Sequence, residues 1–392
     1  MKVIEVAIGR SHHFNLARQL HKHKNLEIFY TGYPRFQFQD EEDIPPEKIK
    51  SVPYFVTPFM FFDRYQLWPN KKLRNQISFL GHQNLDWTVR NSINEPAILI
   101  AYCGAGLYSF KLNKQLGGKN ICDKGSTHIE FQEELLKEEY QRYEMNYEGI
   151  YGKRKNKEIE EYAICDFITI PSKFVFDSFV KKGVPKEKLK IIPYGARTTR
   201  FKPRIKDLKN KAYSNDDDNF NLLFVGNFGA RKGAIDVLEA FKKFTNPNKQ
   251  LTIIGSISKE AKKIFKNYDM SKVKLMGRIR NHLLVEYYQR SNVLLIPSIE
   301  EGSAIVILEA LACGCPVIAT PNAGSEHIKH GFNGFIVPIH SPEKICECLY
   351  KMSDSEGLRQ QLEVNCVETI KEINGWDHYG KQWDNLIKSI NS

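Results

Sequence analysis

The chain has 392 residues, a length that exceeds one ordinary core and favours two domains of comparable size. Its hydrophobic content is 42%. Its net charge of +11 is compatible with phosphorylated substrates or an anionic membrane surface, and the dispersed basic residues form no nucleic-acid signature. No uncharged stretch is long enough to predict a membrane span, and MKVIEVAIGR lacks the apolar segment of a signal peptide, so we expect a cytoplasmic location.

The first elements alternate a strand with a helix. Val3 to Ile8 is typical of a strand that ends at Gly9, and a helical pattern follows over residues 14–20. This order predicts the opening of a doubly wound α/β unit. The connecting segment GRSHH is either a binding loop or a simple connection from strand to helix.

Residues 53–74 have a high density of aromatic side chains and end in Lys71, Lys72 and Arg74. As a surface segment, this stretch would dock on a bilayer interface or hold an acceptor. In the alternative, the aromatic rings pack onto the core of the first domain. Of these two we favour packing.

Two further strands are predicted in the first half, over residues 97–102 and from Ile121 onward. After the second strand, Ser126 and Thr127 are candidates to cap a helix that begins near His128. Further along, residues 202–219 lose apolar periodicity and end in Asp216, Asp217 and Asp218. We interpret this acidic run as a solvated linker, and we assign no metal to it.

The second half alternates strands with helices, which predicts a parallel sheet. The strands are expected at residues 221–225, 251–254, 274–276, 293–296 and 317–319. Ligands bind such sheets at the carboxyl ends of the strands, so the glycine turns there should line one crevice.

One passage, IPSIEEGSAIVILEALACGCPVIAT, carries most of the functional signal. A buried strand stops at Pro297, and Gly302 and Ser303 open a helix whose free amides would face an anion. Glu301 precedes the turn, and Glu309 lies inside the helix. The eight cysteines form no C-x-x-C pair and are expected to be buried free thiols.

The spacing of Glu301 and Glu309, followed by Ala310, Gly314, Pro316 and Val317, resembles the signature of family-4 retaining glycosyltransferases (glycosyl transferases group 1) of the GT-B fold. FVGNFGARKG, the passage 273–298 and IIPYGARTTRFKP are similar to further segments of that family. The resemblance implies two Rossmann-like, doubly wound domains that face each other across a cleft. Residues 1–200 would form the acceptor side and residues 201–377 the donor side, and a helix at 378–392 would cross back onto the first domain.

The resemblance also implies roles for individual residues. The glycine-flanked pair Arg231 and Lys232 would hold the diphosphate, where fixed positive charge is needed as the leaving group gains negative charge. Glu309 would accept hydrogen bonds from the ribose. Glu301 would engage the transferred sugar, with Glu300 as its competitor for that role.

His128 would contact the donor sugar or stabilise the reacting centre, unless it only caps its helix. The other expected contacts lie in turns: Gly9 in an acceptor and phosphate loop, Gly226 and Asn227 after the first donor-side strand, Arg278 and Ile279 against the base, and the amides of Ser303, Ala304 and Ile305 at the diphosphate, beside Gly302. The family commonly has an arginine at the position of Asn227. Either Arg231 makes that contact here, or phosphate binding is weaker than in relatives.

The expected function is therefore the transfer of a sugar from a nucleoside-diphosphate sugar to a hydroxyl of a glycan or lipid-linked acceptor. Surface polysaccharide or glycolipid synthesis is the expected setting, with an optional peripheral contact at the inner membrane face. Retention of configuration, implied by the family, is usually ascribed to attack on the same face, where the departing phosphate helps remove the acceptor proton. No metal, cofactor or carboxylate base is expected. The alternative is a catalytically silent GT-B protein that binds a nucleotide or glycan. A dinucleotide oxidoreductase is disfavoured because no first-domain strand carries the full G-x-G-x-x-G pattern.

Overall fold

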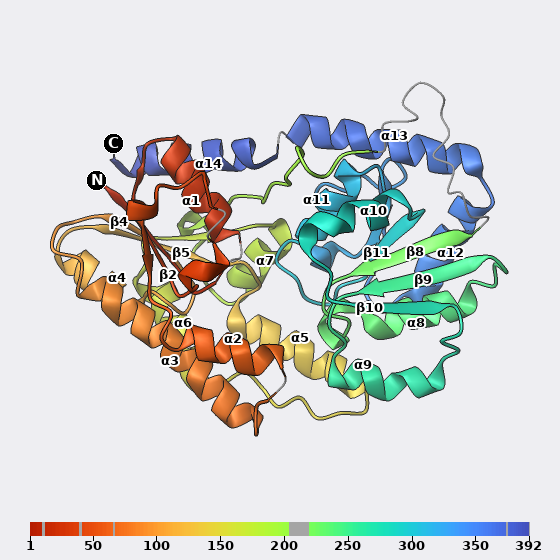
Figure 1. Ribbon diagram of the computed structural model, residues 1–392, viewed down its shortest axis with the longest axis horizontal. Helices are drawn as coiled ribbons and strands as arrows, with labels where there is room; N and C mark the ends of the chain where they lie inside the picture. The colour runs from red at the N-terminus through yellow and green to blue at the C-terminus, as the bar shows by residue number, and fades with distance from the viewer. Residues whose placement is uncertain (10–11, 39–40, 66, 204–218, 374, 392) are drawn as a thin grey trace.

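The computed structural model describes residues 1–9, 12–38, 41–65, 67–203, 219–373 and 375–391. Within these residues the chain forms a seven-stranded sheet of order β3-β2-β1-β4-β5-β6-β7 and a six-stranded sheet of order β10-β9-β8-β11-β12-β13. Neighbouring strands pair in parallel in both sheets. Figure 1 shows the sheets in two lobes that lie side by side. The predicted two-lobed α/β architecture is confirmed.

In the first lobe, the strand β1 lies near the centre of the sheet, between β2 and β4. These central strands are apolar over most of their length because helices cover both faces of the sheet. The strands are β1 (Val3–Ala7), β2 (Leu26–Thr31), β3 (Ile49–Ser51), β4 (Ile98–Tyr102), β5 (Lys119–Asp123), β6 (Phe167–Ile170) and β7 (Leu189–Ile191). The helices are α1 (His13–Lys22), α2 (Val56–Arg64), α3 (Lys71–Arg90), α4 (Leu107–Gln115), α5 (Ile129–Arg142), α6 (Gly152–Ile164) and α7 (Lys173–Lys181).

The second lobe repeats this construction. Its strands are β8 (Phe220–Val225), β9 (Lys249–Ile254), β10 (Val273–Gly277), β11 (Val293–Ile296), β12 (Val317–Ala319) and β13 (Gly334–Ile336). Its helices are α8 (Ala234–Lys243), α9 (Lys259–Ile264), α10 (Leu284–Gln289), α11 (Ile305–Ala312), α12 (Pro342–Ser353) and α13 (Glu356–Ile373). The five strands predicted from sequence are present, and β13 is additional.

The last helix, α14 (Gly375–Asn391), returns to the first lobe. Figure 1 shows α13 along the second lobe and α14 along the first, so that the two chain ends lie close together. Trp383 is buried in the same core cluster as Phe14 of α1. Asn25 donates a hydrogen bond to Asp384 at 2.9 Å, just beyond the end of α1. The predicted crossing helix is confirmed.

Helix α5 also joins the lobes, at its carboxyl end. Arg142 pairs with Asp236 of α8 at 2.8 Å. The ring of Tyr143 is buried in the core of the second lobe, where its hydroxyl accepts a hydrogen bond from the Ile235 amide at 3.2 Å. Each lobe therefore contributes packing to the other, which limits how the cleft between them can open.

The aromatic segment 53–74 differs from the favoured expectation. Tyr54, Phe61, Phe62 and Tyr65 are 75%, 53%, 37% and 56% exposed, so the prediction that these rings pack onto the core is wrong for them. Helix α2 is short and packs against α3. One face of α2 is left without a covering element. No helix of the described residues is both long enough and apolar enough to cross a bilayer.

All eight cysteines are free and buried, as predicted. The acidic run Asp216 to Asp218 lies outside the described residues, and so does most of the linker expected over 202–219. The domain boundary near residue 200 stays a prediction.

Candidate active site

A cleft of about 1440 Å³ opens between the two lobes. Both lobes contribute charged side chains to it, and arginines are prominent. Its lining includes His12, Asn15, Arg18, Tyr102, Gly125, Ser126, Arg154 and Tyr194 from the first lobe and Arg231, Arg280, Asn281, Glu301, Ser303, Ile305 and Glu309 from the second. The second-lobe residues follow the carboxyl ends of β8, β10 and β11, which is where parallel sheets bind ligands.

The turn after β8 is built to approach the segment after β11. Gly233 has φ of 70°, and a Cβ atom there would lie 2.1 Å from the carbonyl oxygen of Pro297, so only glycine fits. The Arg231 carbonyl accepts hydrogen bonds from the amides of Ile299 and Glu300 at 3.0 and 3.2 Å. These contacts hold Arg231 and Lys232 next to Glu300 and Glu301.

The two adjacent glutamates have different surroundings. Glu300 is fully buried and accepts hydrogen bonds from Thr127, Gln132 and Arg231. Burial alone would raise the pKa of Glu300, but the Arg231 guanidinium and the donors from Gln132 and Thr127 hold it below its ordinary value. Glu301 lines the cleft instead. This arrangement favours Glu301 over Glu300 for contact with a sugar.

Lys232 forms an ion pair with Glu301, and Arg231 lies 3.5 Å from the same carboxylate. Burial and the neighbouring Arg231 lower the pKa of Lys232. The lysine therefore needs an anion beside it to remain charged. The charge of Glu300 opposes this lowering, and Glu301 forms the ion pair; Lys232 itself is not among the residues that line the cleft.

Glu309 lies in α11 and reaches the cleft with its carboxylate held in place. Asn281 donates to one oxygen at 2.8 Å, and the Tyr288 hydroxyl donates to the other at 2.9 Å. Burial raises the pKa of Glu309, and the bonds from Asn281 and Tyr288 and the charge of Arg200 oppose that rise. The carboxylate is thus oriented in advance, as a group that receives two ribose hydroxyls must be.

The start of α11 corrects one sequence expectation. The Ala304 amide donates to the Ala323 carbonyl at 2.9 Å, so it is not available to a diphosphate. Ser303 and Ile305, on either side of it, line the cleft. Gly302 contacts the other lobe, because a Cβ atom there would lie 1.8 Å from the Gly125 carbonyl oxygen.

His128 occupies the position that the capping alternative describes. Its Nδ1 accepts a hydrogen bond from the Glu130 amide at 3.3 Å, and its ring contacts Tyr162 and Phe179. The side chain is buried and is not part of the cleft lining given above. Ser126, two residues earlier in the chain, does line the cleft. The contact between His128 and a donor sugar stays a prediction.

The remaining predicted turn residues are not among those that line the cleft, although residues a few positions further along the chain are. Asn227 donates to the Ser256 hydroxyl at 2.9 Å on the exposed side of its turn, and Gly226 next to it has φ of 142°. Arg278 is exposed and Ile279 packs against the second-lobe core, while Arg280 and Asn281 line the cleft. Gly9 follows β1, and among the described residues of that loop it is His12 that lines the cleft. The roles assigned to these turn residues stay predictions.

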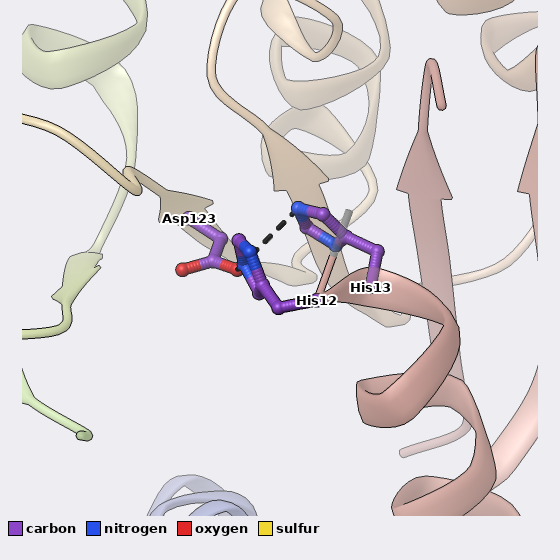
Figure 2. A group of neighbouring side chains, drawn as sticks. All are labelled: His12, His13 and Asp123. Carbon is purple, nitrogen blue, oxygen red and sulfur yellow. Dashed lines mark hydrogen bonds and ion pairs between the residues drawn. The ribbon is translucent and has the colours of Figure 1, made fainter. Parts of the chain in front are cut away.

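His12 lies in the segment GRSHH, which the sequence left open as a binding loop, but the residue itself was not singled out. It is 6% exposed, directly precedes α1, and bonds Asp123 at the end of β5 (Figure 2). A usable signal was present, since His12 follows one predicted strand and Asp123 ends another strand of the same parallel sheet, which places both at the same edge.

Comparisons with known proteins agree with this geometry. The model of the family described as glycosyl transferases group 1 matches residues 205–368. An uncharacterized glycosyltransferase of Methanocaldococcus jannaschii is 27% identical over 239 residues, which are 59% of this chain and 61% of the relative. The capsular polysaccharide biosynthesis glycosyltransferase CapM of Staphylococcus aureus is 25% identical over 223 residues, 53% of this chain and 57% of the relative. The matches span about three fifths of the length of these two curated relatives.

Two solved structures are similar over the whole chain. Sucrose-phosphate synthase from Thermosynechococcus elongatus has a TM-score of 0.74 at 18% identity and is matched over 100% of this chain and 99% of its own. Anabaena HepE in complex with UDP has a TM-score of 0.70 at 14% identity, over 99% of this chain and 100% of its own. Residues 205–368 thus match the family of glycosyl transferases group 1, and the fold of the chain is GT-B.

Proposed function

We propose that this protein is a glycosyltransferase that moves a sugar from a nucleoside-diphosphate sugar to a hydroxyl of a glycan or lipid-linked acceptor. One observation carries the proposal: Arg231, Glu301 and Glu309 of the second lobe line the cleft between the lobes, and Lys232 pairs with Glu301 there. The Anabaena HepE structure with UDP, which has the same fold, supports a nucleotide as the ligand of this wall.

The chemistry of the leaving group fits these side chains. When the bond between the sugar and the diphosphate breaks, negative charge grows on the phosphate oxygens, and Arg231 and Lys232 oppose it. Ser303 and Ile305 at the start of α11 add the positive end of a helix dipole on the same side. Because two side-chain cations are present, we propose that transfer proceeds without a metal ion.

The nucleoside and the sugar are assigned to different carboxylates. Glu309 is held by Asn281 and Tyr288 in an orientation suited to the ribose hydroxyls. Glu301 lies beside Gly302, where the second lobe touches Gly125 of the first, and would bind hydroxyls of the transferred sugar. We further propose retention of configuration, on the strength of the family resemblance.

The proposal is tested by incubating the purified protein with a panel of nucleotide sugars and octyl glycosides and measuring release of free nucleotide. Release that depends on the octyl glycoside, with a new glycoside detected by mass spectrometry, supports transfer. Nucleotide binding without release from any donor would instead support the catalytically silent alternative. The anomeric configuration of the product, read by NMR, tests retention.

We propose in addition that α2 contacts the surface of an anionic membrane. Phe61 and Phe62 are exposed on this helix and Tyr65 is exposed directly after it, and Arg64 and Lys72 lie within the same segment. Aromatic rings next to cations are suited to the boundary between lipid headgroups and acyl chains. This contact would bring a lipid-linked acceptor to the first-lobe side of the cleft.

A further inference from the structure

A second, smaller cavity lies in the first lobe beside the cleft. Its volume is about 180 Å³. Sites that enclose a whole small molecule usually measure about 300–1,000 Å³, so this cavity fits one group of a larger ligand. It lies between α3, the start of α6 and the loop that precedes α6. Arg154 lines both the cavity and the cleft, so a ligand can reach from one into the other.

One wall of the cavity is a single face of α3. Lys71, Asn75, Ser78 and His82 line it, and intervals of four, three and four residues place them along one side of a helix. Over the described residues, the side-chain amide of Asn75 and the hydroxyl of Ser78 make no hydrogen bond. This face therefore offers an amide and a hydroxyl as donors to a ligand, next to the ammonium group of Lys71.

A second wall comes from α6 and carries Arg154 and Lys157. Lys157 is 4% exposed, and its Nζ atom lies 2.7 Å from Oδ2 of Asp86. Despite this ion pair, Lys157 Nζ makes no hydrogen bond of standard geometry to the part of the chain that the structure describes. An ammonium group has three hydrogens to donate, so Lys157 retains donors for a ligand in the cavity.

The carboxylates that balance these cations lie outside the cavity. Arg154 pairs with Glu158, and Lys124 pairs with the same carboxylate. Lys71 pairs with Glu148, and both side chains are at least half exposed, so water screens this pair. The described residues that line the cavity include three cations and no carboxylate. The cavity is therefore suited to an anion.

His82 reflects the same positive surroundings. Burial, with the charges of Arg154 and Lys157, lowers its pKa from 6.5 to about 4, so the ring is neutral near pH 7. Its Nδ1 donates a hydrogen bond to the Ser78 carbonyl at 2.8 Å, which leaves Nε2 as an acceptor. The cavity thus combines several donors for an anion with one acceptor for a hydroxyl.

A phosphate group fits this arrangement better than a carboxylate does. A phosphate ester carries a charge of about −1.5 to −2 near neutral pH and has three terminal acceptor oxygens. A carboxylate has one charge and two oxygens. Three cations from two helices, together with an amide and a hydroxyl, match the larger anion.

We propose that this cavity binds the phosphate group of the acceptor, which makes the acceptor a phosphorylated sugar or a sugar linked to a lipid through phosphate. The phosphate contacts Lys71, Arg154 and Lys157, and the acceptor hydroxyl extends past Arg154 into the first-lobe side of the cleft. The assignment rests on the proposed function and narrows its acceptor to a phosphate ester. Lys71 begins α3, a few residues after the exposed rings of α2, so the cavity adjoins the segment proposed to contact the membrane.

The first test measures the binding of inorganic phosphate by calorimetry. A saturating nucleoside diphosphate is present, so that the donor side is already occupied. Wild type should bind phosphate. The double variant Asp86→Asn/Lys157→Met removes one cation of the cavity together with its buried partner, and it should raise the dissociation constant at least about tenfold because hydrogen bonds to charged groups are strong. Lys71→Met changes a half-exposed side chain and should raise the dissociation constant about two- to fivefold.

The matched control is Lys153→Met. Lys153 is an exposed lysine of α6, one turn from Lys157, and it does not line the cavity. Its replacement removes the same charge and should leave phosphate binding as in wild type. If the double variant does not fold, Lys71→Met and Lys153→Met still decide the question, because both change the surface only. Equal phosphate affinity in these two variants, or no phosphate binding by wild type, would overturn the inference.

The second test compares acceptors, using the donor that supports wild-type turnover. The acceptors are octyl glycosides, their 6-phosphates, a hexuronate and a polyprenyl-diphosphate sugar in vesicles. A phosphorylated acceptor should have a KM at least about tenfold below that of the octyl glycosides, and the double variant should remove this advantage while kcat stays within about twofold. Turnover of the soluble 6-phosphates or of the lipid-linked sugar tells the two sources of phosphate apart, and either result supports the inference.

The remaining outcomes separate this inference from the proposed function. A lower KM for the hexuronate than for any phosphorylated acceptor, or turnover of unphosphorylated acceptors alone, would overturn the inference and leave the proposed function standing. No nucleotide release with any donor and acceptor would overturn the proposed function, and with it the acceptor role of the cavity, even where inorganic phosphate binds.

Discussion

The Glu300 carboxylate accepts hydrogen bonds from both the backbone amide and the hydroxyl of Thr127, at 3.1 and 2.8 Å, although the two residues are 173 positions apart. Thr127 belongs to the first lobe and Glu300 to the second. The same carboxylate accepts a hydrogen bond from Arg231 at 3.1 Å. The contact between the lobes and the cation proposed for the diphosphate therefore share one buried anion, so nucleotide binding and the apposition of the lobes are expected to be linked.

The Thr127 hydroxyl should contribute measurably to stability. Thr127→Val removes a donor from a fully buried carboxylate, and hydrogen bonds to charged groups contribute about 1.5–3 kcal/mol. We expect the free energy of unfolding in urea to fall by about that amount. Thr88→Val is the matched control, since its hydroxyl bonds the Asn84 carbonyl within α3 and its removal should cost less than about 0.5 kcal/mol. Equal losses in the two variants would contradict the role of the buried anion.

Glu309→Gln should weaken nucleotide binding. The amide keeps the shape of the side chain but loses the charge that would receive the ribose hydroxyls, and it turns a donor toward either Asn281 or Tyr288. The dissociation constant for the nucleoside diphosphate should rise about 10–100-fold, the equivalent of roughly 1.4–2.7 kcal/mol. Glu347→Gln, an exposed glutamate of α12 paired with Lys344, should bind nucleotide as wild type does. Unchanged affinity in Glu309→Gln would refute the ribose assignment.

Lys232→Ala should lower turnover more than binding. Removing one electrostatic donor from a site of charge development typically costs about 10²–10³ in kcat. The exposed Lys243→Ala of α8 provides the comparison and should leave kcat intact. If both lysine variants keep wild-type kcat in the nucleotide-release assay, Lys232 does not stabilise the leaving group.

The lowered pKa of His128 predicts that the stability of the folded protein depends on pH. Burial, with the charges of Lys124 and Lys182, lowers its pKa from 6.5 to about 4, so the folded protein binds its proton less readily than the unfolded chain does. This contribution to stability is complete above pH 6.5 and is lost as the pH falls toward 4, by about 1.4 kcal/mol per unit. His128→Asn retains a capping oxygen but cannot take up a proton, so its unfolding midpoint should change less between pH 7 and pH 4.5, about half a unit above the folded pKa. The control His378→Asn changes an exposed histidine, and its unfolding midpoint should vary with pH as that of wild type does. A His128→Asn midpoint that varies with pH in the same way would contradict this prediction.

The exposed rings of α2 should determine membrane affinity. Replacing Phe61, Phe62 and Tyr65 together with serine should lower binding to vesicles containing phosphatidylserine by more than about tenfold, since a fully buried aromatic or aliphatic side chain contributes about 1.5–3 kcal/mol. Co-sedimentation measures the effect. Phe332→Ser, which removes an exposed ring of the second lobe, should bind as wild type does. Equal binding by all three proteins would place the membrane contact elsewhere or exclude it.

Local patterns in the chain were sufficient for several elements. The uninterrupted apolar residues of β11 and the glycine, serine and helical pattern that follow it predicted strand, turn and helix in the right order. Glu301 and Glu309 came from the same stretch, because their spacing is a property of nine consecutive residues. The strands β2, β3, β6, β7 and β13 were not predicted, and three of these five have only three residues, which carry little periodicity.

The sequence by itself determined the alternation of strands and helices behind the two parallel sheets, because apolar segments and turn residues act over a few positions each. The return of α14 to the first lobe and the donor-side roles of Glu301 and Glu309 were implied by the family resemblance. Only the tertiary structure decided which oxygen, nitrogen and amide groups meet. It paired His12 with Asp123 and joined Thr127 to Glu300 by hydrogen bonds, and it placed the Ala304 amide where it donates to the Ala323 carbonyl. Each of these contacts is a short-range polar interaction between atoms distant along the chain, and its existence depends on how the strands are ordered and how the lobes are packed.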